Sequence, residues 1–381
     1  MTSQPHLNWA NAYRDGASPE LANAIMTRSE VLRLTGAPTL FSLKHLSLTT
    51  EVDYGFLLGV IRRTAPAYRA IRIPKNSGGF RDLLSPSQSL MTVQRWILHE
   101  ILNHIPRHPN NFAYFRRVTA KECAERHAGA SWMIKTDLHN YFPSISEKRV
   151  YEVFLGLGYS NLFSFELARL CTWSRTQSPE QVTLQGRSSA GLKWAVPYPL
   201  LAQGVLPQGA PTSGALANAS TARLDAALSN LANKHHLVYT RYSDDMTFSS
   251  AGEFDRRVAA GIIREIRKVV TASGLELHAR KTNLISPGAR KVVLGMLVTA
   301  SGVSILPEQR RMIDIYIHAV EKYGPVDYSA RRGFDSVLSF VNHVEGWLAY
   351  LSHIDPPWTK ARGRAWNSAL EGHLVLLRAL G

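Results

Sequence analysis

The chain has 381 residues, 45% of them hydrophobic and 9% aromatic, and 44 Lys plus Arg against 29 Asp plus Glu give a net charge of +15. This length and apolar content allow a sizeable core, which excludes a disulfide-stapled miniprotein and a mostly disordered protein. The two cysteines, Cys123 and Cys171, form no Cys-x-x-Cys pair and no Cys/His cluster, so a disulfide framework and a structural zinc site are also excluded.

The N-terminal part of the chain predicts helices and turns, followed by a hairpin. Residues 68–73 are typical of a short strand, and residues 74–81 form a glycine-centred turn with the cations Lys75 and Arg81 at its ends. Apolar residues then recur at helical spacing over 90–101, which predicts a helix that packs in the core.

The middle of the chain alternates strands with helices. The predicted elements are a strand at 132–137, a helix after 144, a helix at 213–231, strands at 237–242 and 246–248, a helix at 259–270 and a strand at 292–298. Ser243-Asp244-Asp245 is predicted as the turn between the fourth and fifth of these elements. This order predicts an α+β fold, with a sheet and helices on one face.

The last part of the chain predicts helices only. Pro307 suits the first turn of a helix, and Gly324-Pro325 is expected to stop that helix. A second apolar repeat follows over 337–351. We therefore expect a separable helical subdomain here.

The distribution of apolar residues predicts a soluble cytoplasmic protein. The first thirty residues contain no apolar segment of the kind found in a signal peptide. The uncharged stretch from Trp194 to Thr221 is interrupted by prolines and glycines, so it is not expected to span a membrane.

The positive charge is concentrated in one region. Residues 61–150 contain 15 Lys or Arg and 6 Asp or Glu, so +9 of the +15 falls there. A concentrated basic surface attracts polyanions through counterion release, and nucleic acid is the commonest such partner. The alternative is a surface that serves solubility alone.

Three acidic residues are the candidates for chemistry. Asp137 ends an apolar strand, and Asp244 and Asp245 lie in a tight turn more than a hundred residues later. Carboxylates that converge in one sheet repel one another unless cations intervene, and hard oxygen ligands suit Mg²⁺. Two such ions about 4 Å apart support phosphoryl transfer. The alternative is that Asp-Asp is only a favoured turn pair and Asp137 a solvated strand end.

Three segments, in this order, resemble the reverse transcriptases of bacterial retrons. Tyr242-Ser243-Asp244-Asp245 is similar to the catalytic Tyr-x-Asp-Asp turn of that family, and the segment from Lys135 to Ile145 is similar to its first catalytic strand. Leu206-Pro207-Gln208-Gly209-Ala210-Pro211-Thr212-Ser213 resembles its substrate-contacting loop. The resemblance runs from about Tyr68 to Trp347.

The resemblance implies a right-hand polymerase fold. Its parts would be an N-terminal helical extension at 1–67, interleaved fingers and palm at 68–300, with an antiparallel sheet plus helices in the palm, and a helical thumb at 301–381. The implied activity is RNA-directed DNA synthesis, in which the enzyme copies a cognate structured noncoding RNA into cDNA (msDNA) by two-metal nucleotidyl transfer. The implied setting is antiphage defence with an effector protein.

The resemblance also implies a role for each candidate residue. Asp137, Asp244 and Asp245 would hold two Mg²⁺ ions, and the carbonyl of Leu138 could complete a coordination shell. Residues that would contact the incoming dNTP are Lys75, Arg81, Phe142, Gln208, Gly209 and Lys281. Residues that would contact the primer or template are Tyr242, Ser243, Leu294 and Gly295.

Several of these residues also have structural interpretations. Phe142 falls where the family places a steric gate against the ribose 2′-hydroxyl, but it could equally pack in the core. Lys75 and Arg81 could be ordinary surface cations, and Lys281, a possible proton donor to pyrophosphate, could be a solvated lysine at a strand edge.

Two segments depart from the retron pattern. Retron enzymes usually carry Asn-Ala-x-x-His before the first catalytic strand, and here residues 123–127 keep Ala124 and His127 but not the Asn. Where those enzymes usually have Val-Thr-Gly, this chain has Val293-Leu294-Gly295. Both departures concern recognition of partners. An insertion at about 172–204 predicts no function.

Two alternatives remain open at this point. One is a standalone defence-associated or group II intron-like reverse transcriptase. The other is a catalytically inactive RNA-binding scaffold, against which the presence of Asp137, Asp244 and Asp245 argues, because binding alone requires no converging carboxylates beside a polyanion.

Overall fold

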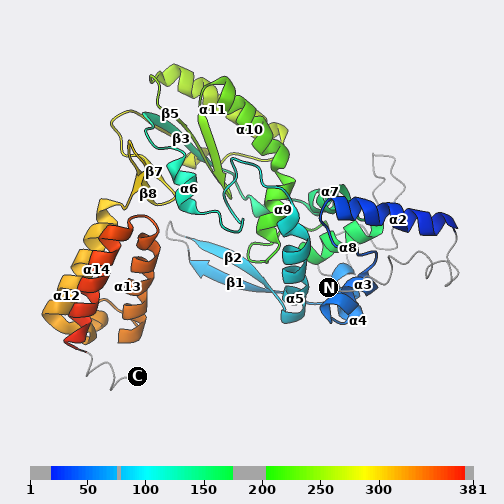
Figure 1. Ribbon diagram of the computed structural model, residues 1–381, viewed down its shortest axis with the longest axis horizontal. Coiled ribbons are helices and arrows are strands. Elements are labelled where there is room, and N and C mark those ends of the chain that lie inside the picture. Colours follow the sequence, from blue (N-terminus) through cyan, green and yellow to red (C-terminus); the bar gives the residue numbers. More distant parts are fainter. Residues whose placement is uncertain (1–18, 75–78, 175–202, 374–381) are drawn as a thin grey trace. The chain divides into compact units, whose positions relative to one another are not determined.

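The computed structural model describes residues 19–74, 79–174 and 203–373, and it consists of two compact units whose segments interleave along the chain (Figure 1). The first unit comprises Met1–Arg117, Asp137–Ser229 and Ile266–His278, and the second comprises Val118–Thr136, Asn230–Glu265 and Ala279–Gly381. No helix in the described ranges is long and apolar enough to cross a membrane.

The first unit combines a two-stranded hairpin with helices. Strands β1 (Tyr68–Pro74) and β2 (Phe80–Pro86) are antiparallel, with Tyr68 opposite Pro86 and Pro74 opposite Phe80, which confirms the predicted hairpin. Its helices are α2 (Pro19–Leu34), α3 (Leu43–Thr50), α4 (Tyr54–Ile61), α5 (Gln88–Trp96), α7 (Glu147–Gly156), α8 (Asn161–Cys171) and α9 (Ser213–Ser220), with shorter helical turns η2 (Ile97–Ile101), η3 (Leu102–His104) and η4 (Phe142–Ser144).

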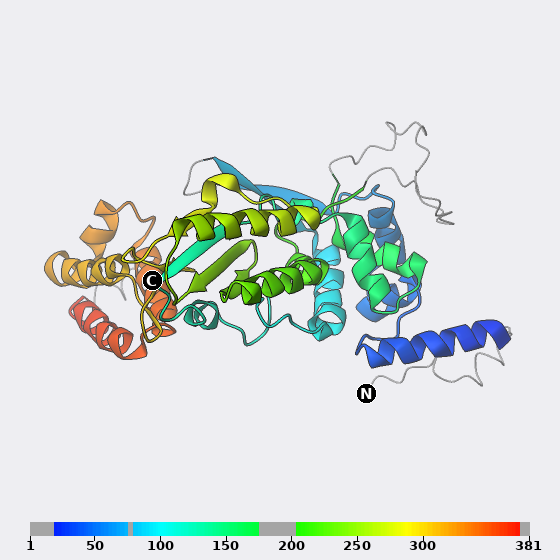
Figure 2. The same cartoon turned by 90° about the horizontal axis from the view of Figure 1, so that it is seen from above.

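Local sequence signals explain where these helices begin. The side chains of Ser42, Asp53 and Ser160 each accept a hydrogen bond from a main-chain N–H in the first turn of the helix that follows. Helices α7 and α8 pack side by side (Figure 2), and α8 is buried from Phe163 to Cys171. Helix α8 also packs against α4 and α5, so it lies in the interior of the first unit.

The second unit contains a four-stranded sheet with the strand order β4-β5-β3-β6. The strands are β3 (Trp132–Asp137), β4 (Val238–Tyr242), β5 (Asp245–Ser250) and β6 (Asn283–Ile285), and α6 (Ala120–Glu125) precedes β3. The N–H of Ser131 donates to the carbonyl of Ser250 (2.7 Å), so the start of β3 lies beside the end of β5. The predicted strand at 132–137 and the predicted hairpin around 243–245 are confirmed.

A three-stranded sheet and a helical bundle complete the second unit. The strands β7 (Val292–Val293), β8 (Met296–Val298) and β9 (Val303–Ser304) pair in that order, and the helices α12 (Pro307–Arg331), α13 (Val337–Ser352) and α14 (Pro356–Glu371) pack against one another (Figure 1). Met296, Phe340 and Trp366 belong to one apolar cluster, so this sheet and the bundle share a core.

Three element boundaries differ from the sequence prediction. The helix expected at 213–231 is divided at Thr221 into α9 and α10 (Ala222–Lys234). The strand expected at 292–298 is a hairpin instead, because Leu294 and Gly295 adopt φ of 49° and 78° and reverse the chain. Helix α12 is kinked at Gly324 (φ 77°) and continues from Pro325, which fits the first turn of a helix. The helix expected at 259–270 is present as α11 (Arg256–Ala272).

His127 joins the two strands of the β4–β5 hairpin. Its ring nitrogens lie 2.7 Å from the hydroxyl of Ser249 on β5 and 2.7 Å from the hydroxyl of Thr240 on β4. Burial, together with the nearby Arg126 and Lys135, lowers the pKa of His127 to about 3. The imidazole is therefore neutral in the folded protein, which lets it accept at one nitrogen and donate at the other.

We predict that His127 makes the protein sensitive to acid. Because its folded pKa is about 3 and an unfolded histidine has a pKa of about 6.5, its contribution to stability is full above pH 6.5. That contribution falls by about 1.4 kcal/mol per pH unit as the pH decreases toward 3. The free energy of unfolding, measured by chemical denaturation between pH 6.5 and 4, should change less steeply with pH for His127→Gln than for the wild type. His318→Gln, which changes an exposed histidine, is the control, and equal slopes for all three proteins would refute the prediction.

Candidate active site

The Asp-Asp turn joins β4 to β5 with two residues. Tyr242 pairs with Asp245, so Ser243 and Asp244 form the turn and Asp245 is the first residue of β5 rather than part of the turn. Ser243 adopts φ of 61°, a conformation that is unfavourable for residues other than glycine. The buried guanidinium of Arg241 donates to the Ser243 carbonyl (2.9 Å), which holds the turn in this conformation.

Asp245 has a cation beside it. The ammonium of Lys135, on the neighbouring strand β3, lies 3.8 Å from the Asp245 carboxylate, and both side chains are partly exposed. This ion pair offsets part of the negative charge that Asp244 and Asp245 place next to each other. The sequence analysis names Lys135 only as part of a motif. Nothing in the sequence indicates its contact with Asp245, because the two residues are far apart in the chain.

Asp137 is the last residue of β3, and its side chain is half-buried. Its carbonyl accepts from the N–H of His278 (2.8 Å), and the N–H of His139 donates to the carbonyl of Glu276 (2.7 Å). Successive residues of a strand direct their main-chain groups to opposite sides, so the carbonyl of Leu138 points away from this segment. That carbonyl is not used in the pairing with residues 276–278.

The donor groups of this region fit a magnesium ion chemically. Asp137, Asp244 and Asp245 supply carboxylate oxygens and Leu138 a carbonyl oxygen, which are the hard ligands that Mg²⁺ prefers. Within residues 19–74, 79–174 and 203–373, no group of three or more His, Cys, Asp or Glu side chains is close enough together to hold a metal ion. The joint metal site therefore stays a prediction.

The loop at 206–213 is attached to the fingers-like hairpin of the first unit. The carbonyl of Gln208 accepts from the N–H of Leu84 on β2 (2.7 Å). Gly209 adopts φ of 119°, and a Cβ atom there would lie 3.1 Å from the Leu84 carbonyl oxygen. The close approach of the chain's own strand thus explains this glycine, while its contact with a nucleotide stays a prediction.

Three cations are expected to contact the incoming dNTP. Arg81 is exposed on β2, opposite Ile73, three residues before the attachment point at Leu84. Lys75 lies outside the described residues. Lys281 is exposed at the end of η6 (Ala279–Lys281) in the second unit. Their contacts with a triphosphate stay predictions.

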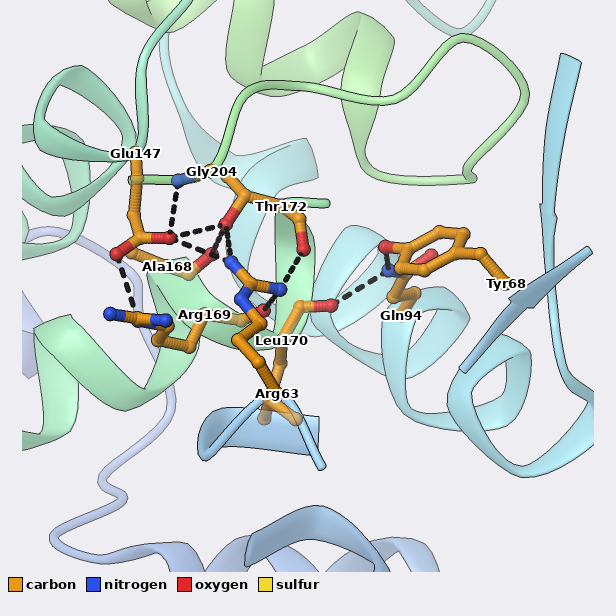
Figure 3. A network of polar contacts seen from close by, with 9 residues as sticks. All are labelled: Arg63, Tyr68, Gln94, Glu147, Ala168, Arg169, Leu170, Thr172 and Gly204. Atoms are coloured by element: carbon orange, nitrogen blue, oxygen red, sulfur yellow. Dashed lines mark hydrogen bonds and ion pairs between the residues drawn. The ribbon is translucent and has the colours of Figure 1, made fainter. Parts of the chain in front are cut away.

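A buried ionic network lies immediately before the loop (Figure 3). The carboxylate of Glu147, in the first turn of α7, pairs with Arg63 (2.7 Å) and Arg169 (2.9 Å) and accepts from the Thr172 hydroxyl (3.0 Å) and the Gly204 N–H (3.1 Å). Burial lowers the pKa of the Arg169 guanidinium, and Glu147 counteracts this effect.

The network fixes the two ends of the insertion. A Cβ atom at Gly204 would lie within 2.7 Å of polar atoms of Arg63, Glu147 and Thr172, so only glycine fits there. Trp173 and Val205 exchange two main-chain hydrogen bonds of 2.9 Å each. The network thereby sets where the loop at 206–213 begins. Sequence reasoning missed it, because Glu147 alone resembles an ordinary acid at the start of a helix.

The hairpin of Leu294 and Gly295 is supported by the helical bundle. The Tyr350 hydroxyl on α13 lies 3.5 Å from the Leu294 carbonyl, and the Gln309 amide on α12 lies 3.4 Å from the Gly295 carbonyl. Burial raises the pKa of Tyr350, and the nearby Tyr242 raises it further. Tyr350 and Gln309 therefore link the helical bundle to the hairpin at 294–295, whose contact with primer or template stays a prediction.

Phe142 lies in η4, five residues after Asp137, and it is only half-buried. Its ring centroid is 5.5 Å from that of Tyr141 and 6.1 Å from that of Tyr114. Its role as a steric gate stays a prediction.

Adjacent carboxylates at a tight turn and at the start of the strand that follows it in a sheet, together with a helical bundle later in the chain, are typical of one class of protein: the nucleic-acid polymerases with a right-hand fold of fingers, palm and thumb. Comparison with known sequences specifies the class further. The family profile described as "Reverse transcriptase (RNA-dependent DNA polymerase)" matches residues 73–311, which is more than half of the chain.

Two curated relatives, both reverse transcriptases, are similar to this chain over most of their length. The retron Ec86 reverse transcriptase of Escherichia coli is 27% identical over 85% of this chain and 88% of its own. The retron Mx65 reverse transcriptase of Myxococcus xanthus is 31% identical over 81% of this chain and 69% of its own. This chain therefore belongs to the reverse transcriptase family, among the retron reverse transcriptases, and is an RNA-directed DNA polymerase.

Comparison with solved structures gives partial likenesses only. Telomerase from Candida albicans gives a TM-score of 0.41 at 10% identity, over 80% of this chain and 57% of the telomerase chain. A foamy viral protease-reverse transcriptase in complex with double-stranded DNA gives 0.36 at 13% identity, over 79% of this chain and 44% of its own. The chain spans about half the length of these two proteins.

Proposed function

We propose that this enzyme copies a cognate structured noncoding RNA into cDNA (msDNA) by two-metal nucleotidyl transfer, as part of a retron antiphage defence system with an effector protein. The observation that supports the chemistry is the two-residue turn that presents Asp244 beside Asp245, on a strand next to the one that ends at Asp137. Membership of the retron reverse transcriptases supports the RNA partner.

In this proposal the carboxylates of Asp137, Asp244 and Asp245 hold two Mg²⁺ ions, with the carbonyl of Leu138 as a further ligand. The ions, when bound, activate the primer 3′-hydroxyl and neutralise the leaving oxygen of the triphosphate. Lys135 limits the repulsion between the carboxylates through its ion pair with Asp245.

The remaining candidate residues position the substrates. Ser243 is small, so the turn leaves room for the primer end, and Tyr242 with the hairpin of Leu294 and Gly295 would support the primer. Gln208 and Gly209 would position the incoming dNTP, Lys75 and Arg81 would bind its triphosphate, and Lys281 would donate a proton to pyrophosphate. A division into an N-terminal extension at 1–67, fingers and palm at 68–300 and thumb at 301–381 belongs to this proposal.

The RNA partner is consistent with the charge of the chain. The region from residue 61 to 150 carries +9 of the +15, and exposed arginines such as Arg72 and Arg81 lie on the hairpin of the first unit. Neutralisation of phosphates by such cations supplies most of the affinity for a nucleic-acid backbone. We propose a cytoplasmic location, where the RNA and dNTPs are available.

The proposal is tested by the nucleic acid that copurifies with the protein. We expect RNA joined to a short single-stranded DNA, together with primer extension by the purified protein on an RNA template with dNTPs and Mg²⁺. Long or repetitive cDNA would favour a standalone defence-associated or group II intron-like enzyme instead. Bound RNA with no DNA and no primer extension would identify an inactive scaffold.

We predict that Phe142→Ala relaxes the selection of deoxynucleotides. If the ring excludes a ribose 2′-hydroxyl, its removal should raise incorporation of ribonucleotides relative to deoxynucleotides by about 10- to 200-fold, the range for a steric pocket contact. Single-nucleotide incorporation with matched dNTP and rNTP measures this ratio. Leu155→Ala, at an exposed apolar position on α7, is the control, and an unchanged ratio for Phe142→Ala would assign that ring to packing.

A further inference from the structure

Tyr114 combines an unfavourable backbone conformation with an exposed side chain. It adopts φ of 64°, which is unfavourable for an aromatic residue, yet its side chain is 48% exposed. Its backbone is held by its neighbour, because the Ala113 carbonyl accepts from the buried Asn218 amide on α9 (2.7 Å). A residue retained in a strained and exposed position points to a functional role.

The ring of Tyr114 lies on the start of helix α9. A Cβ atom at Gly214 would come within 2.5 to 2.8 Å of three ring carbons of Tyr114, so the absence of a side chain at residue 214 creates the place for this ring. Gly214 and Asn218 are four residues apart and share one face of α9. One helix therefore fixes both the backbone and the ring of this segment.

Phe142 neighbours two aromatic rings that α9 positions. One is Tyr141, which is buried and whose hydroxyl lies 3.1 Å from that of Thr221 at the end of α9. The other is the exposed ring of Tyr114, tilted by 60° to Phe142 at a centroid distance of 6.1 Å. Such tilted pairs are favourable and restrict how each ring can turn.

We infer that Tyr114 is a positioning residue for the selection of deoxynucleotides. Seated on Gly214, it limits the movement of the neighbouring Phe142 ring, which Tyr141 also contacts. This inference rests on the proposed role of Phe142 as a steric gate. Tyr114 does not itself need to contact the nucleotide, and its effect on selectivity passes through Phe142.

The test replaces Tyr114 with Gly, which adopts φ of 64° without strain. Tyr114→Gly should raise the ratio of kcat/KM for an rNTP to that for the matched dNTP by roughly 2- to 10-fold, the value of one aromatic contact. Its melting temperature should stay the same or rise. Tyr114→Phe, which keeps the ring, should keep the wild-type ratio. A structural role would instead lower stability and leave the ratio unchanged.

A double-variant comparison separates this inference from the proposed gate. If Tyr114 acts through Phe142, the ratio for Tyr114→Gly combined with Phe142→Ala should equal that for Phe142→Ala alone. Multiplicative effects would overturn the inference, as would an unchanged ratio in Tyr114→Gly when Phe142→Ala alone raises it. An unchanged ratio in Phe142→Ala would overturn the gate itself.

Discussion

Asp244→Asn is expected to abolish primer extension on an RNA template while the protein remains folded. The proposed metal ions stabilise the transferring phosphoryl group by several kcal/mol, so loss of one carboxylate ligand should lower the rate by about 10³-fold or more. Asparagine is tolerated in tight turns, and Arg241 should still hold the carbonyl of Ser243. Steady-state extension with dNTPs and Mg²⁺ measures the loss, and circular dichroism verifies the fold.

A matched control removes a different acid from the second unit. Glu253 is exposed just after β5, so Glu253→Gln changes the net charge equally and should retain full extension. Activity of Asp244→Asn within tenfold of the wild type would contradict the two-metal proposal. Asp137→Asn should behave like Asp244→Asn, because both carboxylates are proposed to hold the same ions.

Glu147→Ala is expected to lower the free energy of unfolding more than the other proposed substitutions do. Without this carboxylate, the guanidinium groups of Arg63 and Arg169 are left in a buried region without their shared counter-charge, their side chains being 9% and 3% exposed. Breaking a buried ion pair in this way costs about 3–5 kcal/mol. Urea unfolding of the purified protein should show the change in the free energy of unfolding.

The control for this measurement is on the same helix. Glu152 is exposed on α7, and Glu152→Ala should change the free energy of unfolding by less than about 0.5 kcal/mol. A loss below about 1 kcal/mol for Glu147→Ala would show that the carbonyls of Arg169 and Thr172, which Arg63 also contacts, suffice to keep the network in place.

The sequence predicts those parts of the fold that depend on local signals. The glycine-centred turn before Arg81 predicts the β1–β2 hairpin, and the apolar run ending at Asp137 predicts β3, because turn residues and strand patterns act over a few positions. The continuous strand predicted over 292–298 is wrong, because Leu294 adopts a positive φ that is rare for leucine, and residue patterns therefore do not predict the reversal there.

The contacts that organise the site depend on residues far apart in the chain. Glu147 pairs with Arg63, 84 residues away, and nothing near either residue in the sequence indicates the partner. The same holds for Lys135 and Asp245, and for Tyr114 on Gly214. Such contacts follow from tertiary packing, which residue patterns alone do not specify. Motifs identify the candidate residues in the sequence, but no motif identifies the residues that support them.

The bond between Leu84 and Gln208 has a mechanical consequence. A two-stranded ribbon tied to its neighbour at one strand cannot swing as an independent flap, because any tilt at its far end must be carried through Leu84 into the main chain of Gln208 and Gly209. If the ribbon closes over a nucleotide, as proposed, the 206–213 segment is expected to move with it. A substitution at either place will therefore alter both.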